Sequence, residues 1–372
     1  MDIDRNILFS PVRIGGLEIP NRFVRSATHD YLSDDDGFVT DAQVDLYEKL
    51  AEGEVGLIIS GHAHVQPSGK ASPRQMAVYE DRFIEGLSRI PNAVAGFSSR
   101  VFLQVAHAGR QTKEKLCGCV PVSPSAVPDP VSKTEPRALA PEEIRILIAD
   151  FTAAAVRARR AGFHGVQLHA AHGYLLSSFL SPHTNRRTDV WGGSVENRAR
   201  VLVEILREVK AACGSDFPVI VKLNSTDFLE GGLSLGDAVR IAHLLENDGI
   251  DGIEVSGGMA EAGRGSVQPG LRSEDEEGYF VENAAEIKRA VKVPVFALGG
   301  IRTLAVAERI VREGRADLVS LSRPLIRDPF LVRHFREGAA AKSACISCNR
   351  CFNPRGIRCA ELAGKNGFNR KE

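Results

Sequence analysis

Eight short apolar runs, separated by segments with helical periodicity, constrain the fold of this chain more than any other feature. The runs are rich in β-branched residues and nearly continuous in apolar side chains, as is typical of parallel strands buried on both faces. They cover residues 23–27, 56–60, 101–106, 165–169, 219–224, 252–256, 295–299 and 317–322. Helical patterns lie between them, among others over residues 141–161, 197–213 and 235–249.

Strand alternating with helix implies right-handed βαβ units, and eight such units predict an α/β fold closed into a TIM (β/α)8 barrel. A doubly wound open sheet is the alternative. We expect the barrel to cover residues 1–339, and residues 340–372 to form a short Cys-rich extension. Two stretches interrupt the pattern: the proline-rich residues 111–137 and the Gly-, Glu- and Arg-rich residues 258–278, which we interpret as a mobile loop. Both follow strands, so in a barrel both lie at the C-terminal rim, where active sites are assembled.

Composition excludes several classes of partner. Lys plus Arg number 47 and Asp plus Glu number 47, so the net charge is zero, which favours neither nucleic acid nor an anionic membrane. No apolar run reaches the roughly 20 residues that span a bilayer, and the first residues lack a basic-then-apolar signal pattern. We therefore expect a cytoplasmic protein.

A cluster of polar side chains follows the fourth predicted strand. His169 and His172 are three residues apart and could donate hydrogen bonds to one oxygen, and Tyr174 could supply a proton from the same side. The alternatives are a metal pair or two core histidines with internal partners. A metal site would need a nearby carboxylate or third histidine, and none is adjacent in the sequence.

Other strands also carry polar residues suited to a ligand. Gln104 offers a paired donor and acceptor to an amide-like ring edge, or it is a buried amide bonded to neighbouring backbone. Lys222 is a lone cation in an apolar run and needs a negative partner, either an internal carboxylate or a bound anionic cofactor. Gly299-Gly300 and Ser322-Arg323 end strands seven and eight, the usual phosphate site of this barrel.

A set of longer motifs carries a specific resemblance. The set comprises Leu-Phe-Ser-Pro at 8–11, Asn-Arg-Phe-Val at 21–24, and residues 104–110, 169–175, 179–182, 192–198, 314–317 and 323–329. With these motifs the chain resembles the Old Yellow Enzyme family of NADH:flavin oxidoreductases, nearest the branch with 2,4-dienoyl-CoA reductase and trimethylamine dehydrogenase. In the motif at 192–198, Glu196 and Arg198 are interpreted as fold-stabilising ion pairs rather than as catalysts.

The resemblance implies a barrel that binds FMN at its C-terminal mouth and is reduced by NAD(P)H. Gln104 would bind the pyrimidine edge, and Lys222 would lie near N1 and the C2 carbonyl. The other cofactor contacts would be Ala27, Thr28, Gly299, Gly300, Ser322 and Arg323. Substrate would be bound by His29, Tyr31, His169 and His172, with Tyr174 as the proton donor. Lys222 departs from the arginine common in the family, and His29 and His62 also depart from the usual pattern.

Four cysteines crowd together near the C-terminus. Cys345, Cys348, Cys351 and Cys359 give C-x2-C-x2-C-x7-C, a spacing that lets a tight loop direct several thiolates at one metal or cluster. The pattern resembles the [4Fe–4S] site of the dienoyl-CoA reductase branch, with a shorter last spacer. Tetrahedral zinc and an empty site are the alternatives. No Gly-x-Gly-x-x-Gly fingerprint follows a strand, so we expect electrons either from a separate electron-transfer protein or directly from NAD(P)H.

The resemblance favours an ene-reductase that transfers hydride from reduced flavin to a C=C bond conjugated to a carbonyl or thioester. One alternative is a flavin and iron–sulfur dehydrogenase of a small amine-like substrate that passes electrons to a separate acceptor. Another is an electron carrier without substrate turnover. The paired histidines favour the first, because they suit a carbonyl oxygen. Family members also lead us to expect a homo-oligomer.

Overall fold

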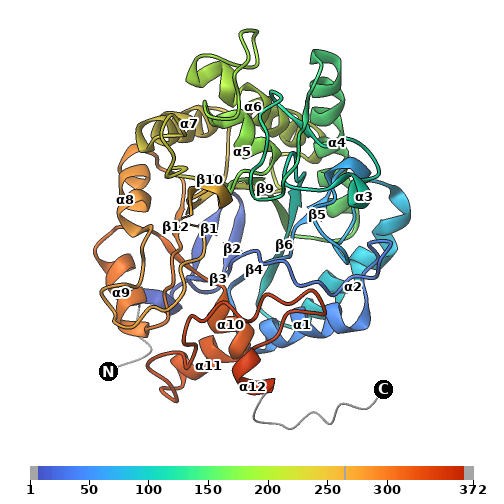
Figure 1. The fold of residues 1–372 in the computed structure, drawn as a ribbon. Coiled ribbons are helices and arrows are strands. Elements are labelled where there is room, and N and C mark those ends of the chain that lie inside the picture. Colours follow the sequence, from blue (N-terminus) through green and yellow to red (C-terminus); the bar gives the residue numbers. More distant parts are fainter. Residues whose placement is uncertain (1–6, 264, 364–372) are drawn as a thin grey trace.

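The computed structural model describes residues 7–263 and 265–363. Its centre is a closed ring of eight parallel strands (Figure 1). In ring order these are β3 (Phe23–Arg25), β4 (Leu57–Ile59), β6 (Arg100–Ala106), β9 (Gly165–Ala170), β10 (Val219–Asn224), β11 (Gly252–Ser256), β12 (Val295–Ala297) and β13 (Leu318–Leu321). The ring closes because β13 pairs with β3, and β4 with β6. The predicted TIM barrel is confirmed, and the open-sheet alternative is wrong.

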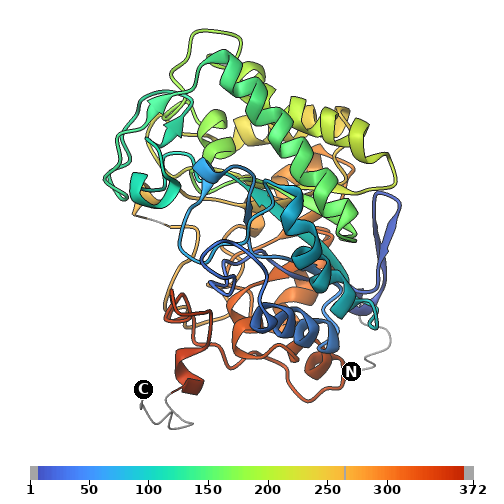
Figure 2. The ribbon, with the colours of Figure 1, turned by 90° about the vertical axis from the view of Figure 1, so that its right-hand side faces the viewer.

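Helices surround the ring of strands (Figures 1 and 2). The longer ones are α1 (Asp41–Glu52), α2 (Ile84–Val94), α4 (Pro141–Arg160), α6 (Val195–Cys213), α7 (Leu235–Asn247), α8 (Val281–Ala290) and α9 (Leu304–Arg312). Shorter ones are α3 (Glu114–Cys117), α5 (Leu175–Leu180), α10 (Arg323–Arg327), α11 (Leu331–Arg336) and α12 (Ala360–Ala363). Outside the ring, β5 (Ala63–His64) pairs with β6, and β7 (Val122–Ser123) pairs with β8 (Arg137–Ala138).

The predicted helices begin and end at residues that form capping interactions. Helix α4 begins at Pro141, and the Glu143 carboxylate accepts a hydrogen bond from the Ala140 backbone N–H at 2.8 Å. Helix α7 is capped by Ser234, whose hydroxyl accepts from the Asp237 N–H at 3.1 Å. It is followed by Gly249 at φ +83°, the left-handed conformation that ends helices. These boundaries lie within two residues of those predicted from sequence.

The 192–198 motif is structural, as expected. Arg198 is buried; it forms an ion pair with Asp237 at 2.9 Å and donates to the backbone oxygens of Leu180 and Gly193. Glu196 pairs with Arg240 on the surface. The Arg198 guanidinium thereby ties α6 to α7 and to the chain that follows α5.

One end of the barrel is closed by an apolar plug. The antiparallel hairpin of β1 (Val12–Ile14) and β2 (Leu17–Ile19) packs Ile14 and Ile19 against apolar side chains from inside the barrel. The barrel residues in this cluster are Val24, Leu57, Ile59, Phe102, Ile220, Phe296 and Leu318. Because apolar groups fill this end, polar side chains inside the barrel are confined to the opposite, C-terminal end.

The described part of the extension, residues 340–363, packs against loops at the C-terminal end of the barrel. Ser347 accepts a hydrogen bond from Gly270, Asn349 donates to the Val267 carbonyl, and Ile357 donates to the Asp30 carbonyl. The loop of residues 258–278 is therefore held from the C-terminal side. The domain boundary at residue 339 stays a prediction. None of the described helices is long and apolar enough to cross a membrane.

Candidate active site

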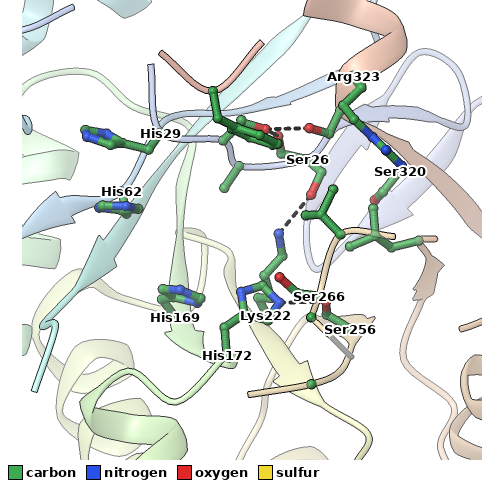
Figure 3. A pocket seen from close by; sticks show the side chains of 18 of the residues that line it. Ser26, His29, His62, His169, His172, Lys222, Ser256, Ser266, Ser320 and Arg323 are labelled. Carbon is green, nitrogen blue, oxygen red and sulfur yellow. Dashed lines mark hydrogen bonds between the residues drawn. The ribbon is translucent and has the colours of Figure 1, made fainter. Parts of the chain in front are cut away.

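A cavity of about 500 Å³ lies at the C-terminal ends of the barrel strands, the size of an ordinary cofactor or ligand pocket (Figure 3). Eleven of the residues predicted for the site line it. They are Ala27, Thr28, His29, Gln104, His169, His172, Tyr174, Lys222, Gly300, Ser322 and Arg323. The structure thus brings together side chains from six strand ends that are far apart in sequence.

Two predicted residues are not among those that line the cavity, and their contacts with ligand stay predictions. Gly299 has φ +130°, and a Cβ at this position would lie 2.8 Å from the Tyr279 backbone nitrogen. Glycine is therefore needed there for close backbone packing. Tyr31 stacks on His29, with ring centroids 3.8 Å apart, and so contacts a lining residue instead of the cavity.

A buried polar network crosses the floor of the cavity. The Lys222 ammonium lies 3.3 Å from the Glu254 carboxylate and donates to the Ser26 hydroxyl at 2.8 Å. Gln167 donates to Glu254 at 2.9 Å, and Gln104 donates to Gln167 at 2.7 Å. The strand register explains these contacts, because Lys222 pairs with Glu254, and Gln104 with Gln167, across neighbouring strands. The internal carboxylate considered as a partner for Lys222 is present, and contact with an anionic cofactor stays a prediction.

The paired histidines and the tyrosine form one wall of the cavity. The ring centroids of His169 and His172 are 5.4 Å apart, and those of His169 and Tyr174 are 4.8 Å apart. His172 adopts φ +64°, and its backbone N–H donates to the Asn224 side chain at 3.0 Å. Its ring Nε2 lies 2.8 Å from the Ser256 hydroxyl (Figure 3). The predicted convergence of these side chains is present.

Burial keeps these histidines neutral. Desolvation lowers the pKa of His172 and of His29 to about 3, and it holds the pKa of His169 and His62 well below the ordinary value. Nearby charge on Lys222 acts in the same direction on His172. Burial also raises the pKa of the Tyr174 phenol. At neutral pH the wall therefore presents uncharged imidazoles and a protonated phenol.

These depressed histidine pKa values predict acid sensitivity. The unfolded chain binds protons at its histidines as pH falls through about 6.5, while folded His29 and His172 stay neutral until about pH 3. Their stabilisation is complete above about pH 6.5 and is lost as pH falls toward 3. We expect each to lower the free energy of unfolding by on the order of 1 kcal/mol at about pH 5.5. Urea unfolding at several pH values checks this, and a flat profile from neutral pH to about 5.5 would contradict it.

The opposite end of the cavity carries hydroxyls and a guanidinium. The hydroxyls of Thr28 and Ser322 are 2.8 Å apart, and Arg323 Nη1 donates to the Asn349 side chain at 2.7 Å. Arg323 Nη1 also donates to the backbone oxygens of Gln268 and Ser347. The arginine is thus anchored to the extension while it lines the cavity. Its fixed position suits an anionic group of a ligand.

Two residues that line the cavity carry polar atoms without a partner. Within the described chain, His169 Nδ1 and Ser320 Oγ are buried and have no hydrogen-bond partner. Buried polar groups are normally satisfied, so these two residues have hydrogen-bonding capacity left for a ligand. An extended aromatic ring system with polar edges and a phosphate, such as FMN, fits this donor set.

Several lining or supporting residues were missed by the sequence interpretation. Glu254 and Gln167 are polar residues in runs interpreted only as apolar strands, and the rule that singled out Lys222 would also have found Glu254. Ser26, Ser256 and Ser320 carry no comparable signal, because small hydroxyl residues are common in strands. From the extension, Phe352 reaches the cavity, which only the folded chain shows.

The four cysteines of the extension line one small cavity of about 20 Å³. Arg323 and Asn349 line both this cavity and the large one, so the two are neighbours. Across residues 7–263 and 265–363, however, no group of three His, Cys, Asp or Glu side chains lies close enough to hold a metal ion. The thiols are therefore neighbours, but in this arrangement they do not form a ligand set.

A closed barrel with this cavity at its C-terminal mouth defines the class of small-molecule enzymes built on the (β/α)8 fold. Within that class the chain belongs to the NADH:flavin oxidoreductase / NADH oxidase family, whose model matches residues 7–342. The family supports FMN as the cofactor and NAD(P)H as the reductant.

Curated relatives agree with this assignment. An NADH oxidase of Thermoanaerobacter brockii is 40% identical over 371 residues, which cover 97% of this chain and 56% of the relative. An NADPH dehydrogenase of Bacillus subtilis is 36% identical over 327 residues, 88% of this chain and 93% of the relative. The chain thus spans about half the length of the first relative and nearly all of the second.

Solved structures show the same similarity. A 2-naphthoyl-CoA reductase in complex with 2-naphthoyl-CoA superposes with a TM-score of 0.86 at 32% identity, covering 93% of this chain and 54% of that one. The old yellow enzyme homologue of Zymomonas mobilis gives 0.79 at 29% identity, covering 95% and 97%. The resemblance inferred from the sequence motifs is confirmed.

Proposed function

We propose that this protein is an FMN-dependent ene-reductase that reduces a C=C bond conjugated to a carbonyl or thioester. The observation that carries the proposal is the wall formed by His169, His172 and Tyr174, which places two neutral imidazoles and a protonated phenol beside one cavity. Such a wall can hold a carbonyl oxygen and deliver a proton to the carbon skeleton attached to it.

The remaining lining residues would hold FMN. Gln104 and Lys222 would contact the polar edge of the ring from the barrel floor, and the Lys222 ammonium is fixed there by Glu254 and Ser26. The ligand's phosphate would lie toward Gly300 and Arg323 at the other end of the cavity. When bound, FMN supplies the hydride, and the protein supplies position and electrostatics.

His169 and His172 would bind the substrate oxygen. Each imidazole is neutral and therefore carries one N–H donor, and His169 Nδ1 has no partner within the described chain. As the double bond is reduced, negative charge develops on the carbonyl oxygen. Two preorganised donors stabilise that charge by a few kcal/mol without reorganising. The proton that completes the reduction would come from the Tyr174 hydroxyl.

The relatives support a reductive direction and the substrate class. Two of them are named for NADH or NADPH oxidation, and the 2-naphthoyl-CoA reductase is complexed with a conjugated aromatic thioester. A carbonyl or thioester next to an unsaturated carbon is the group that the histidine pair suits.

The test is anaerobic turnover of 2-cyclohexenone and of an enoyl thioester by protein loaded with FMN, with NADH or NADPH as the donor. We expect saturated product and stoichiometric loss of reduced nicotinamide. Trimethylamine with a dye acceptor tests the amine-oxidising alternative. Amine-dependent dye reduction without enone turnover would overturn the proposal, and so would FMN binding without turnover of any substrate.

We also propose that Cys345, Cys348, Cys351 and Cys359 hold a [4Fe–4S] cluster. Four thiols around one cavity provide the ligand type such a cluster requires, but they must turn inward to bind it. Arg323 and Asn349 line both this cavity and the large one, where FMN would bind, and this proximity would suit exchange of electrons with a separate protein.

Metal analysis provides a prediction for this site. Protein purified without oxygen is expected to contain about four iron atoms and four acid-labile sulfides per chain. Cys351→Ser should lower both, because one cluster ligand is lost, whereas Cys213→Ser, on α6, should leave both unchanged. One zinc per chain, or no metal, would contradict the proposal.

A further inference from the structure

One histidine of the cavity has no role in the proposed chemistry. His62, in the segment between β4 and β5, lines the cavity and is 9% exposed. Its ring is stacked between those of His29 and His169, with centroid distances of 4.8 and 6.3 Å. The Tyr174 ring meets it edge-on at 5.5 Å. His62 is therefore held between His29 and His169 (Figure 3), and the predicted proton donor lies against its ring.

The hydrogen bonds of Gln75 fix the tautomer of His62. The Gln75 Oε1 accepts from the Ala71 backbone N–H at 2.6 Å, which assigns oxygen to that side of the amide. The amide nitrogen, a donor only, then faces His62 Nδ1 at 2.7 Å. Nδ1 must accept this bond, so it carries no proton. Because burial keeps the imidazole neutral, its single proton is on Nε2.

His62 Nε2 lies 3.5 Å from the Tyr174 hydroxyl oxygen, the outer limit of a hydrogen bond. Catalytic hydrogen bonds are often this long before substrate binds and shorten in the complex. With the proton on Nε2, the imidazole can only donate, and the phenol oxygen accepts. The hydroxyl proton of Tyr174 is then directed away from His62 and is free for another acceptor.

We propose that His62, oriented by Gln75, is a positioning residue for Tyr174 that directs its proton toward substrate and stabilises the phenolate left behind. This inference rests on the proposed function. In the step, the Tyr174 O–H bond breaks and a C–H bond forms at the substrate carbon next to the carbonyl. The electron pair of the new bond comes from the carbon–carbon double bond of the enolate that hydride addition to the other alkene carbon would leave. The electron pair of the O–H bond stays on the phenol oxygen, where the His62 N–H binds it, and water later returns the proton.

Nitrogen NMR of the imidazole tests the tautomer without any turnover. Spectra of ¹⁵N-labelled protein, with His62 assigned by comparison with His62→Phe, are expected to show protonated Nε2 and bare Nδ1 at neutral pH. Gln75→Leu removes the donor that fixes this state, and the spectrum should then show a mixture of tautomers. A proton on Nδ1 in the unaltered protein would overturn the inference, whether or not the His62 variant folds well enough for kinetics.

Kinetic measurements then distinguish a positioning role of His62 from a merely structural one. His62→Phe keeps a stacked ring but removes the N–H, so substrate reduction should slow about tenfold, the value of one hydrogen bond of about 1.4 kcal/mol. The solvent isotope effect should rise, because proton transfer becomes slower. A fluorinated tyrosine at position 174, whose phenol is more acidic, should recover part of the loss, which a merely structural role would not allow.

The controls distinguish this inference from the proposed function. Reduction of FMN by NAD(P)H should be unchanged in His62→Phe. His64→Phe removes another buried, neutral histidine that bonds Gln66 and does not line the cavity, and it should leave every rate unchanged. An unaltered rate and isotope effect in His62→Phe overturn the inference alone. If Tyr174→Phe is also fully active, the proposed proton donor is wrong as well.

Discussion

Replacing Tyr174 by phenylalanine is expected to slow substrate reduction by about 10²- to 10⁴-fold, the usual contribution of a general acid. Burial raises the pKa of this phenol, so the hydroxyl holds its proton throughout the neutral range. Its ring contacts those of His169 and His62, which fix the hydroxyl beside the place predicted for substrate. Phenylalanine keeps these ring contacts and removes only the hydroxyl group.

Flavin reduction by NAD(P)H and flavin reoxidation by substrate can be measured separately, and only the second should depend on Tyr174. In rapid-mixing experiments, bleaching of the flavin absorption by NAD(P)H should proceed at the same rate in Tyr174→Phe and in the unaltered protein. Reoxidation by 2-cyclohexenone should carry the entire loss. Tyr79→Phe is a matched control, because that hydroxyl bonds Arg82 away from the cavity. A variant that slows both halves equally would indicate a disturbed flavin site, and one that slows neither would exclude Tyr174 as the donor.

The fold was predictable because its strands are buried on both faces and are therefore mostly apolar, with only single polar residues such as Lys222 and Glu254 within them. The predicted bounds of β10 and β11 agree with the structure at both ends. The run at 295–299 was predicted two residues too long, because Gly299 at φ +130° cannot continue the strand β12 beyond its last residue, Ala297. Hydrophobicity alone does not show where the backbone leaves the extended region.

The site was predictable where a residue type is unusual for its element. Lys222 was found because a buried cation in an apolar run needs a negatively charged partner. Gln104 was found because an inward-facing amide offers both a donor and an acceptor to a ligand. The structure shows that both belong to one network through Gln167 and Glu254. That network depends on the pairing of strands β6 with β9 and β10 with β11, and the register of these pairs cannot be determined from a single sequence.

Residues outside regular elements were the least predictable. His62 was noted only as a departure from the family pattern, and its contact with Gln75 joins the loops before and after β5. The link from Arg323 to Asn349 likewise joins the start of α10, just after the last barrel strand, to the extension. Local sequence carries information on turns and strands, whereas these contacts follow from tertiary packing.

The buried pair of Lys222 and Glu254 predicts the largest effect on stability. The side chains are 3% and 0% exposed, and the ammonium lies 3.3 Å from the carboxylate. Lys222→Met would leave the carboxylate buried without its cation, for which we expect a loss of about 3–5 kcal/mol in the free energy of unfolding. Glu254 would retain only the hydrogen bond from Gln167, and one of its oxygens already has no partner within the described chain.

Urea unfolding of five proteins, each with and without added FMN, tests whether the pair or the single charge matters: the unaltered protein, two single variants, the double variant and a control. Lys222→Met and Glu254→Gln should each destabilise, but the double variant should recover most of the loss, because no unpaired charge then remains buried. Arg289→Met is the control; its ion pair with Glu286 is exposed and should be worth less than about 1 kcal/mol. Additive losses in the double variant would contradict the pairing. Equal stabilisation of Lys222→Met and the unaltered protein by FMN would show that this lysine contributes to the fold and not to cofactor binding.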